Sequence, residues 1–533
     1  MVKRISPVVL KELMESGRPH AVLDVRDPME FHEKQVFMTT NAPRGAIELL
    51  AARLVPVKTT PVVCMDEGGS RAERVAGLLE ECGYTDVSVL EGGLGAWEAQ
   101  AFPTVSGTNV PSKDFGERIH VENEVPEITA RELFDLIESD APPRIFDTRT
   151  EVEFERFCVP TGCSLPGGEL ILHAWDLDQD RETPLIINCA GRTRSIIGTQ
   201  ALHRLGVTHA RALKNGGMGI MLEGLQLDEG KPSEIPAPSE ESRAHGEVLG
   251  AQVAEEEGIP FVSVEELRAL KSQADTQTLY VLDVRLAPEF SEGHVPGAIS
   301  IPGGQAAQRT DEVIAVRAGK VVTYCDKNAR GVMAAYWLRQ MGLDVSVLRG
   351  GLNAWREAGG GIEKPSEAAL GESPAGAGEI LLLEGARAQT RAYSAGEASA
   401  RRPRFGAVLD VDLSSSYERG HLPGSVWVSR GRLEEEAPGR AVNQRARVLC
   451  VCEDGRKSAL SALALQRLGY RRAGYLEGGK TAWREAGLPL ETGREGLDAQ
   501  PRDVQLKPYD IGRSAMEGYL TWEENLGKKY ARK

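Results

Sequence analysis

The sequence predicts an α/β protein of four tandem domains, each a small parallel sheet covered by helices on both faces. Three observations support this prediction. The chain has 533 residues, which suits three or four domains of about 150 residues each. One signature of strands and loops recurs four times along it. Within each copy, apolar strands alternate with helical segments, and that alternation is typical of a parallel sheet buried on both faces.

Each copy begins with an apolar strand that ends in Asp-x-Arg or a near variant. These strands are VLDVR, IFDTR, VLDVR and VLDVD, at 22–26, 145–149, 281–285 and 408–412. A second apolar strand then enters a polar loop, and a helical run, a third strand and a double glycine follow. The last residue of Asp-x-Arg stands 40 residues before the first residue of the loop in all four copies. Chance repetition does not explain so regular a spacing, and internal repeats of this kind indicate tandem units.

The repeats set the expected domain boundaries. Domains 1 to 4 are expected at 1–101, 121–228, 259–360 and 379–492, and a tail at 493–533. Capping signals support helices near the start of three domains, at Ser6-Pro7, Thr129…Glu132 and Ser263…Glu266.

The segments between the domains differ in composition and in the order that we expect of them. Residues 231–258 and 359–378 are rich in small and polar residues and lack a periodic apolar face, so both are expected to be flexible linkers. Residues 101–124 are expected to be ordered but irregular. The end of the chain, AMEGYLTWEENLGKKYARK, is interpreted as a helix docked on a domain, with a partner-binding helix as the alternative.

Composition narrows the function classes. The net charge of −15 argues against general binding to nucleic acids and against docking on anionic membranes. No apolar run approaches the roughly 18 residues that span a bilayer, and the first residues lack the apolar core of a secretion signal. We therefore expect a cytoplasmic protein. Its eight cysteines are accordingly expected to be thiols rather than a disulfide framework.

The loop CAGRTRS, residues 189–195, carries the strongest chemical signal. Cys189 leaves a buried strand and enters a tight turn that opens a helix, where successive backbone N–H groups can bind an anion. Such a site favours a thiolate over a thiol. Arg192 and Arg194 would add fixed positive charge. A buried strand cysteine that merely packs is the alternative, but packing does not require two arginines in the same loop.

Four features together resemble the rhodanese family, and most of all its four-domain bacterial sulfurtransferases. They are the Asp-x-Arg strand, the segment EFSEGHVPGA at 289–298, the C-x4-R-S loop and the closing GG-x-x-AW. The resemblance covers nearly all of the chain outside the linkers and the tail. It implies a persulfide enzyme without cofactor or metal, whose loop cysteine takes a sulfane sulfur from a donor such as thiosulfate. The acceptor would be cyanide or a thiol, and a protein thiol is a further candidate.

The same resemblance assigns site residues to this sequence. The nucleophiles would be Cys189, Cys325 and Cys452, and the substrate-binding residues would be Gly191, Arg192, Thr193, Arg194, Ser195 and Arg330. No metal ligands are expected. The histidines of the GHxPG segment, His294 and His421, are expected to be structural.

The four loops are not equivalent. Their first positions hold Asp66, Cys189, Cys325 and Cys452, and their sixth positions hold Arg71, Arg194, Arg330 and Lys457. Domain 2 is therefore expected to be the main active site. Domain 3 would be a weaker second site because Asp326 adjoins its cysteine, and domain 4 is doubtful because Asp412 replaces the arginine of Asp-x-Arg.

Domain 1 is expected to lack activity because a carboxylate stands where the nucleophile belongs. Asp66 would then occupy the amides of its own loop and pair with Arg71. Cys64, two residues upstream on the strand, would pack inertly in the sheet.

Other functions stay open at this point. A phosphatase or arsenate reductase of related fold would use a C-x5-R loop, one residue longer than the four-residue spacing from Cys189 to Arg194. A sulfur-binding scaffold or sensor of degenerate domains is the second alternative. Cys158 and Cys163 lack a partner cluster for zinc, although Cys158 could resolve a persulfide. Cys450-x-Cys452 does not have the Cys-x-x-Cys redox spacing.

Overall fold

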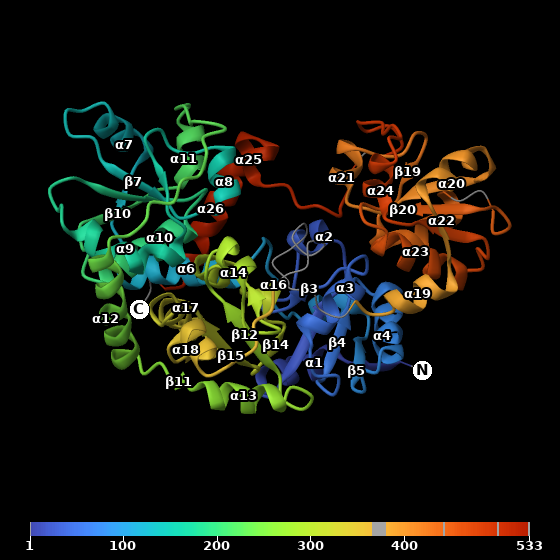
Figure 1. The fold of residues 1–533 in the computed structure, drawn as a ribbon, viewed down its shortest axis with the longest axis horizontal. Coiled ribbons are helices and arrows are strands. Elements are labelled where there is room, and N and C mark those ends of the chain that lie inside the picture. The colour runs from blue at the N-terminus through green and yellow to red at the C-terminus, as the bar shows by residue number, and fades with distance from the viewer. Residues whose placement is uncertain (1, 365–379, 441–442, 498–499, 531–533) are drawn as a thin grey trace. The chain divides into compact units, whose positions relative to one another are not determined.

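The computed structural model describes residues 2–364, 380–440, 443–497 and 500–530. Its chain divides into two compact units. Unit 1 consists of residues 1–108 and 378–505, and unit 2 consists of residues 109–377 and 506–533. Each unit contains two of the expected α/β domains (Figure 1). Domains 1 and 4 form unit 1, whereas domains 2 and 3 form unit 2.

Domain 1 is built around the parallel strands β1-β5-β4-β2-β3, in that spatial order. Its strands are β1 (Lys3–Ile5), β2 (His20–Asp24), β3 (Thr40–Asn41), β4 (Val62–Met65) and β5 (Val87–Leu90). Its helices are α1 (Pro7–Glu15), α2 (Pro28–Glu33), α3 (Ile47–Leu54), α4 (Arg71–Glu81) and α5 (Gly93–Ala99).

Domain 2 has the same topology, with the parallel order β6-β10-β9-β7-β8. Its strands are β6 (Glu127–Ile128), β7 (Arg144–Asp147), β8 (Cys163–Ser164), β9 (Leu185–Asn188) and β10 (Ala210–Leu213). Its helices are α7 (Ala130–Ile137), α8 (Glu151–Arg156), the short η1 (Gly167–Glu169), α9 (Leu170–Asp178), α10 (Thr193–Arg204) and α11 (Gly216–Leu222).

Domain 3 repeats this order as β11-β16-β15-β12-β13. Its strands are β11 (Phe261–Val262), β12 (Leu279–Asp283), β13 (Ile299–Ser300), β14 (Val316–Arg317), β15 (Lys320–Tyr324) and β16 (Asp344–Leu348). Its helices are α13 (Val264–Ser272), α14 (Ala287–Glu292), α15 (Gly303–Gln308), α16 (Thr310–Val313), α17 (Ala329–Gln340) and α18 (Gly351–Glu357).

Domain 4 has the order β17-β21-β20-β18-β19. Its strands are β17 (Arg391–Tyr393), β18 (Ala407–Asp410), β19 (Val426–Trp427), β20 (Val448–Val451) and β21 (Ala473–Leu476). Its helices are α19 (Leu383–Gln389), α20 (Ala395–Ala400), η3 (Arg402–Arg404), α21 (Ser414–Arg419), η4 (Arg430–Arg432), α22 (Leu433–Arg440), α23 (Arg456–Arg467) and α24 (Gly479–Glu485). The prediction of four parallel sheets flanked by helices is confirmed.

Two segments differ from the sequence-based expectation. Residues 231–258, expected to be flexible, contain the helix α12 (Glu240–Glu256), which packs on α9 and α17. Its buried stripe includes Ser242, Gly246 and Gly250, and such small residues give no apolar periodicity that would predict a helix. Residues 101–124, expected to be irregular, contain the helix α6 (Val110–Glu122). Most of the segment 359–378 lies outside the described residues.

The tail confirms the interpretation of a helix docked on a domain. After the short α25 (Pro508–Ile511), the helix α26 (Arg513–Gly527) packs against α6 and α11 within unit 2. Met516 and Leu520 form an apolar cluster with Met218 of domain 2. The C-terminal helix therefore lies on domain 2, although domain 4 precedes it in the sequence.

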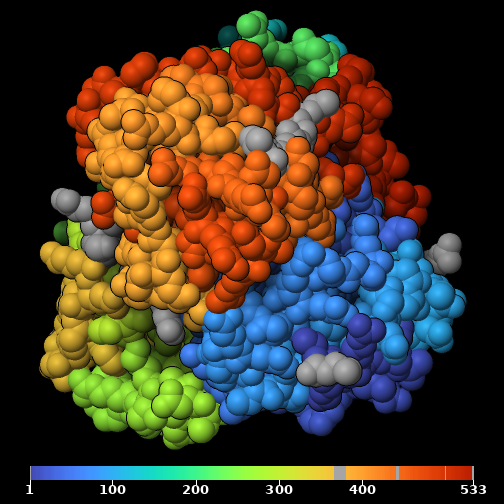
Figure 2. All heavy atoms as spheres, turned by 90° about the vertical axis from the view of Figure 1, so that its right-hand side faces the viewer, coloured from blue at the N-terminus to red at the C-terminus, as the bar shows by residue number. Residues whose placement is uncertain are grey.

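The two domains of each unit meet through equivalent residues. In unit 1, Arg44 pairs with Glu434, and Arg430, at the position equivalent to Arg44, pairs with Glu48 at 2.8 Å. Figure 2 shows the atoms of domain 4 lying against those of domain 1. In unit 2 these positions hold Gly167 and Gly303, and a Cβ placed on Gly168, the next residue, would lie only 2.9 Å from the backbone nitrogen of Gly303. Both contacts follow the pattern of a two-fold interface.

The Asp-x-Arg strands have a structural role. In domain 2, Arg149 donates bidentate hydrogen bonds to Asp147, and it also contacts the carbonyl of Phe157. Domains 1 and 3 make the same buried pair between the aspartate and the arginine of the motif. The pair joins the end of the central strand to the segment that follows it.

Candidate active site

The loop of domain 2 connects β9 to α10, as expected, and Cys189 is only 2% exposed. Its thiol donates a hydrogen bond to Ser195 Oγ at 3.5 Å, and Ser195 Oγ in turn donates to the carbonyl of Arg192 at 2.8 Å. The backbone N–H of Gly217 donates to the carbonyl of Cys189 at 2.9 Å. The double glycine thus holds the start of the loop in place. Only glycine fits at Gly216, because a Cβ there would clash with the loop backbone and because its φ is +51°.

The two arginines of this loop are both bound by carboxylates. Arg194 forms a bidentate pair with Glu153, at 2.7 and 2.8 Å, and this pairing holds the pKa of Glu153 far below its usual range although burial opposes it. Arg192 donates to Glu117 of α6 at 2.7 Å. Both guanidinium groups are therefore balanced by negative charge. Glu117 could not be found from the sequence, because it lies in a segment that was expected to be irregular.

The remaining substrate-binding candidates, Gly191 and Thr193, contact the C-terminal helix. Thr193 Oγ1 donates to Glu523 Oε1 at 2.9 Å, and Tyr519 donates to the same oxygen at 3.1 Å. A Cβ placed on Gly191 would lie 3.3 Å from Glu523 Oε2 and 3.7 Å from Tyr519 Cε1. Sequence reasoning missed both residues of α26. The sequence of the tail predicted a docked helix but not the surface on which it docks.

Domain 3 has its loop covered by a carboxylate from α12. The backbone N–H groups of Asn328 and Ala329 both donate to Glu247, each at 3.2 Å. These are loop amides of the kind that would bind an anionic donor. Arg330 is held by Glu289, Glu169 and Asp326.

Cys325 itself is buried in domain 3, with 1% exposure. Burial and the neighbouring Asp326 raise the pKa of its thiol to about 12. The thiolate needed for nucleophilic attack is therefore scarce at neutral pH.

Domain 1 places Asp66 at the head of its loop. The Asp66 carboxylate accepts hydrogen bonds from the backbone N–H groups of Gly68, Gly69 and Ala72, at 2.7 to 3.0 Å. The expected occupation of the loop amides by this carboxylate is confirmed. The expected pairing of Asp66 with Arg71 is wrong, because Arg71 forms a bidentate pair with Glu30 of α2. Burial, followed by the charge of Asp66, raises the pKa of Cys64 to about 12, as the strand position predicted.

Domain 4 compensates for the aspartate in its motif with two lysines, of which Lys457 of the loop lies 3.1 Å from Asp412. Lys480 Nζ is fully buried and lies 3.3 Å from Asp410 and 3.7 Å from Asp412. Lys480 follows the double glycine, where the other domains have Leu94, Met218 and Leu352. In the sequence, the lysine of LEGGK was the signal that could have identified Lys480. Burial, followed by Asp454 and Asp412, raises the pKa of Cys452 to about 11.

The other singled-out residues have structural surroundings. His294 and His421 stack on Phe290 and Tyr417 at the same place in their domains. Cys158 is buried and its backbone bridges to Asp228, whereas Cys163 is exposed. Among the described residues, no group of side chains is suited to hold a metal ion. Within the same ranges, no helix combines the length and apolar character needed to cross a membrane.

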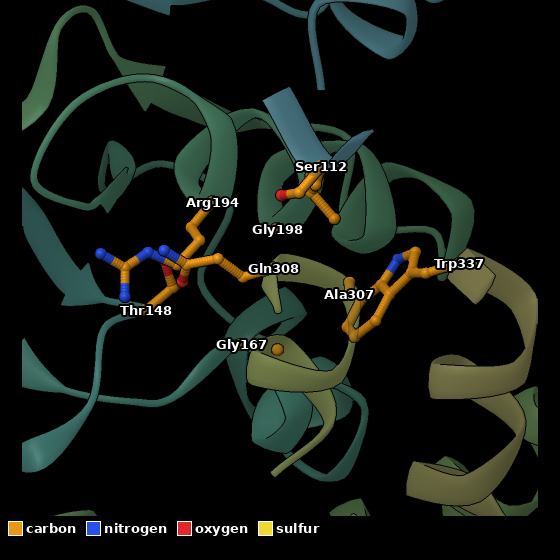
Figure 3. A pocket seen from close by; sticks show the side chains of 10 residues that line it. Ser112, Thr148, Gly167, Arg194, Gly198, Ala307, Gln308 and Trp337 are labelled. Carbon is orange, nitrogen blue, oxygen red and sulfur yellow. The ribbon is translucent and has the colours of Figure 1, made fainter. Parts of the chain in front are cut away.

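A small cavity lies beside Arg194 where domain 2 meets domain 3 (Figure 3). Ser112, Thr148, Gln308 and Trp337 line it. Its volume of about 10 Å³ suits a single water molecule and is too small for a sulfur donor. This cavity is therefore not a candidate donor site.

Comparison with known proteins gives one consistent result. The family described as rhodanese-like domain matches residues 6–100, 129–221, 263–358 and 394–486. The crystal structure of a thiosulfate sulfurtransferase from Pseudomonas aeruginosa aligns with 100% of this chain and 98% of its own, with a TM-score of 0.88 and 34% identity.

Two curated relatives agree with this match. A putative thiosulfate sulfurtransferase of Mycobacterium tuberculosis is 27% identical over 266 residues, 40% of this chain and 89% of the relative. A sulfurtransferase of Allochromatium vinosum is 36% identical over 93 residues, 17% of this chain and 85% of the relative. Each of the four segments matched by the family contains one of the loops described above.

Proposed function

Because the chain belongs to the family of rhodanese-like domains, we propose that it is a sulfurtransferase that carries sulfane sulfur as a persulfide on Cys189. One observation carries the proposal. Of the three loop cysteines, Cys189 alone heads a loop without an acidic neighbour such as Asp326 or Asp454. The thiols of Cys325 and Cys452 have pKa values raised to about 12 and about 11.

The reaction would proceed in two displacements. The Cys189 thiolate attacks the outer sulfur of thiosulfate, the S–S bond of the donor breaks, and sulfite leaves with the electron pair. A thiolate or cyanide then attacks the outer sulfur of the persulfide, and Cys189 leaves as a thiolate. Ser195 Oγ lies 3.5 Å from the sulfur, and its hydroxyl would donate to that thiolate by turning away from the Arg192 carbonyl to which it donates in the structure.

The partners follow from this chemistry. The donor would be a small sulfur compound and the acceptor a thiol or cyanide, with a protein thiol as a further candidate. All eight cysteines are free thiols, which fits the proposed cytoplasmic location. A scaffold role fits domain 1, where Asp66 fills its own loop, but it does not account for the cysteine loop of domain 2.

Steady-state thiosulfate:cyanide activity tests this proposal. Cys189→Ser should abolish most turnover, because the hydroxyl is a far weaker nucleophile at nearly the same volume. Cys325→Ser and Cys452→Ser are matched controls that should retain most of it. If Cys189→Ser stays active while either control variant is dead, the assignment to domain 2 is wrong.

A further inference from the structure

The C-terminal helix α26 covers the loop that bears Cys189. Its buried stripe consists of Met516, Leu520, Glu523 and Gly527, one residue for every turn or so of the helix. The apolar members seat the helix on Met218. Glu523, only 1% exposed, is thereby brought against the loop.

The two carboxylate oxygens of Glu523 differ in their hydrogen-bond partners. Its Oε1 accepts hydrogen bonds from Thr193 and Tyr519. Its Oε2 is buried and has no hydrogen-bond partner among the described residues. That oxygen is the one that faces Gly191, two residues after Cys189. A buried carboxylate oxygen without a partner is costly, so it marks a place where charge serves something other than stability.

Two of the buried cations near Glu523 are already paired with other carboxylates. Arg192 is matched by Glu117, and Arg194 by Glu153. Lys113 of α6 is the remaining buried cation whose charge acts on Glu523, and it lowers the pKa of that carboxyl while burial, the larger effect, raises it. Lys113 forms no ion pair within 4.0 Å in the part of the chain that the structure describes. A doubly negative donor would therefore meet little net attraction at this loop.

We propose that Glu523 makes Cys189 selective for sulfur donors of low negative charge, so that a monoanionic thiosulfonate is used in preference to dianionic thiosulfate. This inference rests on the proposed function. The chemical step is the same for both donors, because the Cys189 thiolate bonds to the outer sulfur and the donor S–S bond breaks. The leaving group is sulfite from thiosulfate and methanesulfinate from methanethiosulfonate. Only the charge brought to the loop differs.

The test compares the two donors on the full chain at one fixed ionic strength, since salt screens charge interactions. The measurement is the second-order rate constant for the gain of one sulfur atom at Cys189. In Glu523→Gln the advantage of methanethiosulfonate over thiosulfate should fall about tenfold, because one nearby charge repels a dianion more than a monoanion. The amide oxygen can still accept from Thr193 and Tyr519, so the helix should stay docked.

Glu524→Gln is the matched control. It removes the same charge from the next residue of the same helix, but the Glu524 side chain is 47% exposed and faces Arg192 at 3.6 Å. Solvent screens such a charge, so the donor ratio should change by less than about twofold. An equal fall in both variants would show a general charge effect and would overturn the proposal.

Lys113→Met tests the same electrostatic effect by removing a positive charge near the loop instead of a negative one. Removing this cation should widen the advantage of the monoanionic donor, and an unchanged or smaller advantage would contradict the selectivity even if Glu523→Gln did not fold. An unchanged ratio of the two donor rate constants in folded Glu523→Gln would also contradict the selectivity. If the wild-type chain gains sulfur at Cys189 from neither donor, the proposed function itself fails, and that outcome is distinct from the two above.

Discussion

At the scale of single residues, the four loops show how one backbone shape is used in different ways. The amides at the start of the loop helix bind the nearest available carboxylate. In domain 1 that carboxylate is Asp66 of the loop itself, and in domain 3 it is Glu247 of α12. In domain 2 the equivalent helix position is Lys113, and Cys189 heads the loop. The residue that faces the amides therefore distinguishes a candidate catalytic loop from a loop whose amides already bind a carboxylate.

Asp66→Cys should create a thiol that reacts much faster than Cys64. The new thiol would head a loop whose amides the Asp66 carboxylate no longer fills, whereas burial holds the pKa of Cys64 near 12. Alkylation rates of the two residues at pH 7.5, mapped by peptide mass spectrometry, measure the difference. Asp66→Ser is the control for the loss of the carboxylate. A new thiol as unreactive as Cys64 would show that domain 1 lacks more than the nucleophile.

Cys325 should alkylate slowly at neutral pH and about tenfold faster for each added pH unit. The sign follows from its pKa, because burial raises it to about 12 and only the thiolate reacts. Rates measured between pH 7 and pH 10 give the slope. A plateau below pH 9 would mean that the thiolate is stabilised after all, and it would restore domain 3 as an active site.

The nucleophile candidates could be predicted from the sequence, but the residues that cover them could not. Cys189 and Asp66 were found because the 40-residue spacing fixes their register. Glu247 and Glu523 stand far from the loops they contact, and no pattern in the sequence links them to those loops. Their contacts depend on where α12 and α26 dock, which is a property of tertiary packing.

At the scale of elements, the helices α6 and α12 explain the main error of the sequence-based fold. Each precedes a domain and packs on its loop helix through a glycine. A Cβ on Gly116 would meet Thr193 Cα at 3.3 Å, and one on Gly250 would meet Ala329 Cα at 3.2 Å. Close helix approach through small residues leaves no large apolar stripe, so the sequence around α12 predicts a flexible linker.

Gly246→Val should release α12 from α9. Its Cβ would lie 2.9 Å from the carbonyl oxygen of Ile171, and overpacking of this kind costs about 1–3 kcal/mol. Hydrogen exchange of residues 240–256 should accelerate accordingly. Val248→Ala, an exposed site on the same helix, should change stability by less than about 0.5 kcal/mol. Equal exchange in both variants would mean that the helix is not held by this contact.

At the scale of the whole molecule, the fold is two pairs of similar domains. The parallel sheets and the double-glycine turns were predictable, because each repeat carries the full pattern of strands and helices. The pairing of domain 1 with domain 4, and of domain 2 with domain 3, was not. It depends on contacts between equivalent surfaces, such as the crossed pairs of Arg44 with Glu434 and Arg430 with Glu48.

Unit 1 should lose stability in acid through Glu48. Burial opposes its ionisation, but Arg430 and Arg44 lower its pKa from 4.5 to about 2. A lowered carboxyl pKa stabilises the fold above the unfolded value, and that contribution, about 3 kcal/mol, is lost as pH falls from about 4.5 towards 2. Protection factors of α3 against hydrogen exchange should fall over this range. In Glu48→Gln they should be low at both ends and depend less on pH, and an equal dependence would exclude Glu48 as the cause.

Locating the transferred sulfur tests directly whether Cys189 is the nucleophile. The full chain is treated with methanethiosulfonate or thiosulfate, free persulfides are trapped with an alkylating reagent, and peptides that contain each of the eight cysteines are analysed by mass spectrometry. We expect a gain of one sulfur atom at Cys189, with little at Cys325 and Cys452 and none at Cys64. Sulfur on Cys325 or Cys452 without sulfur on Cys189 would contradict it.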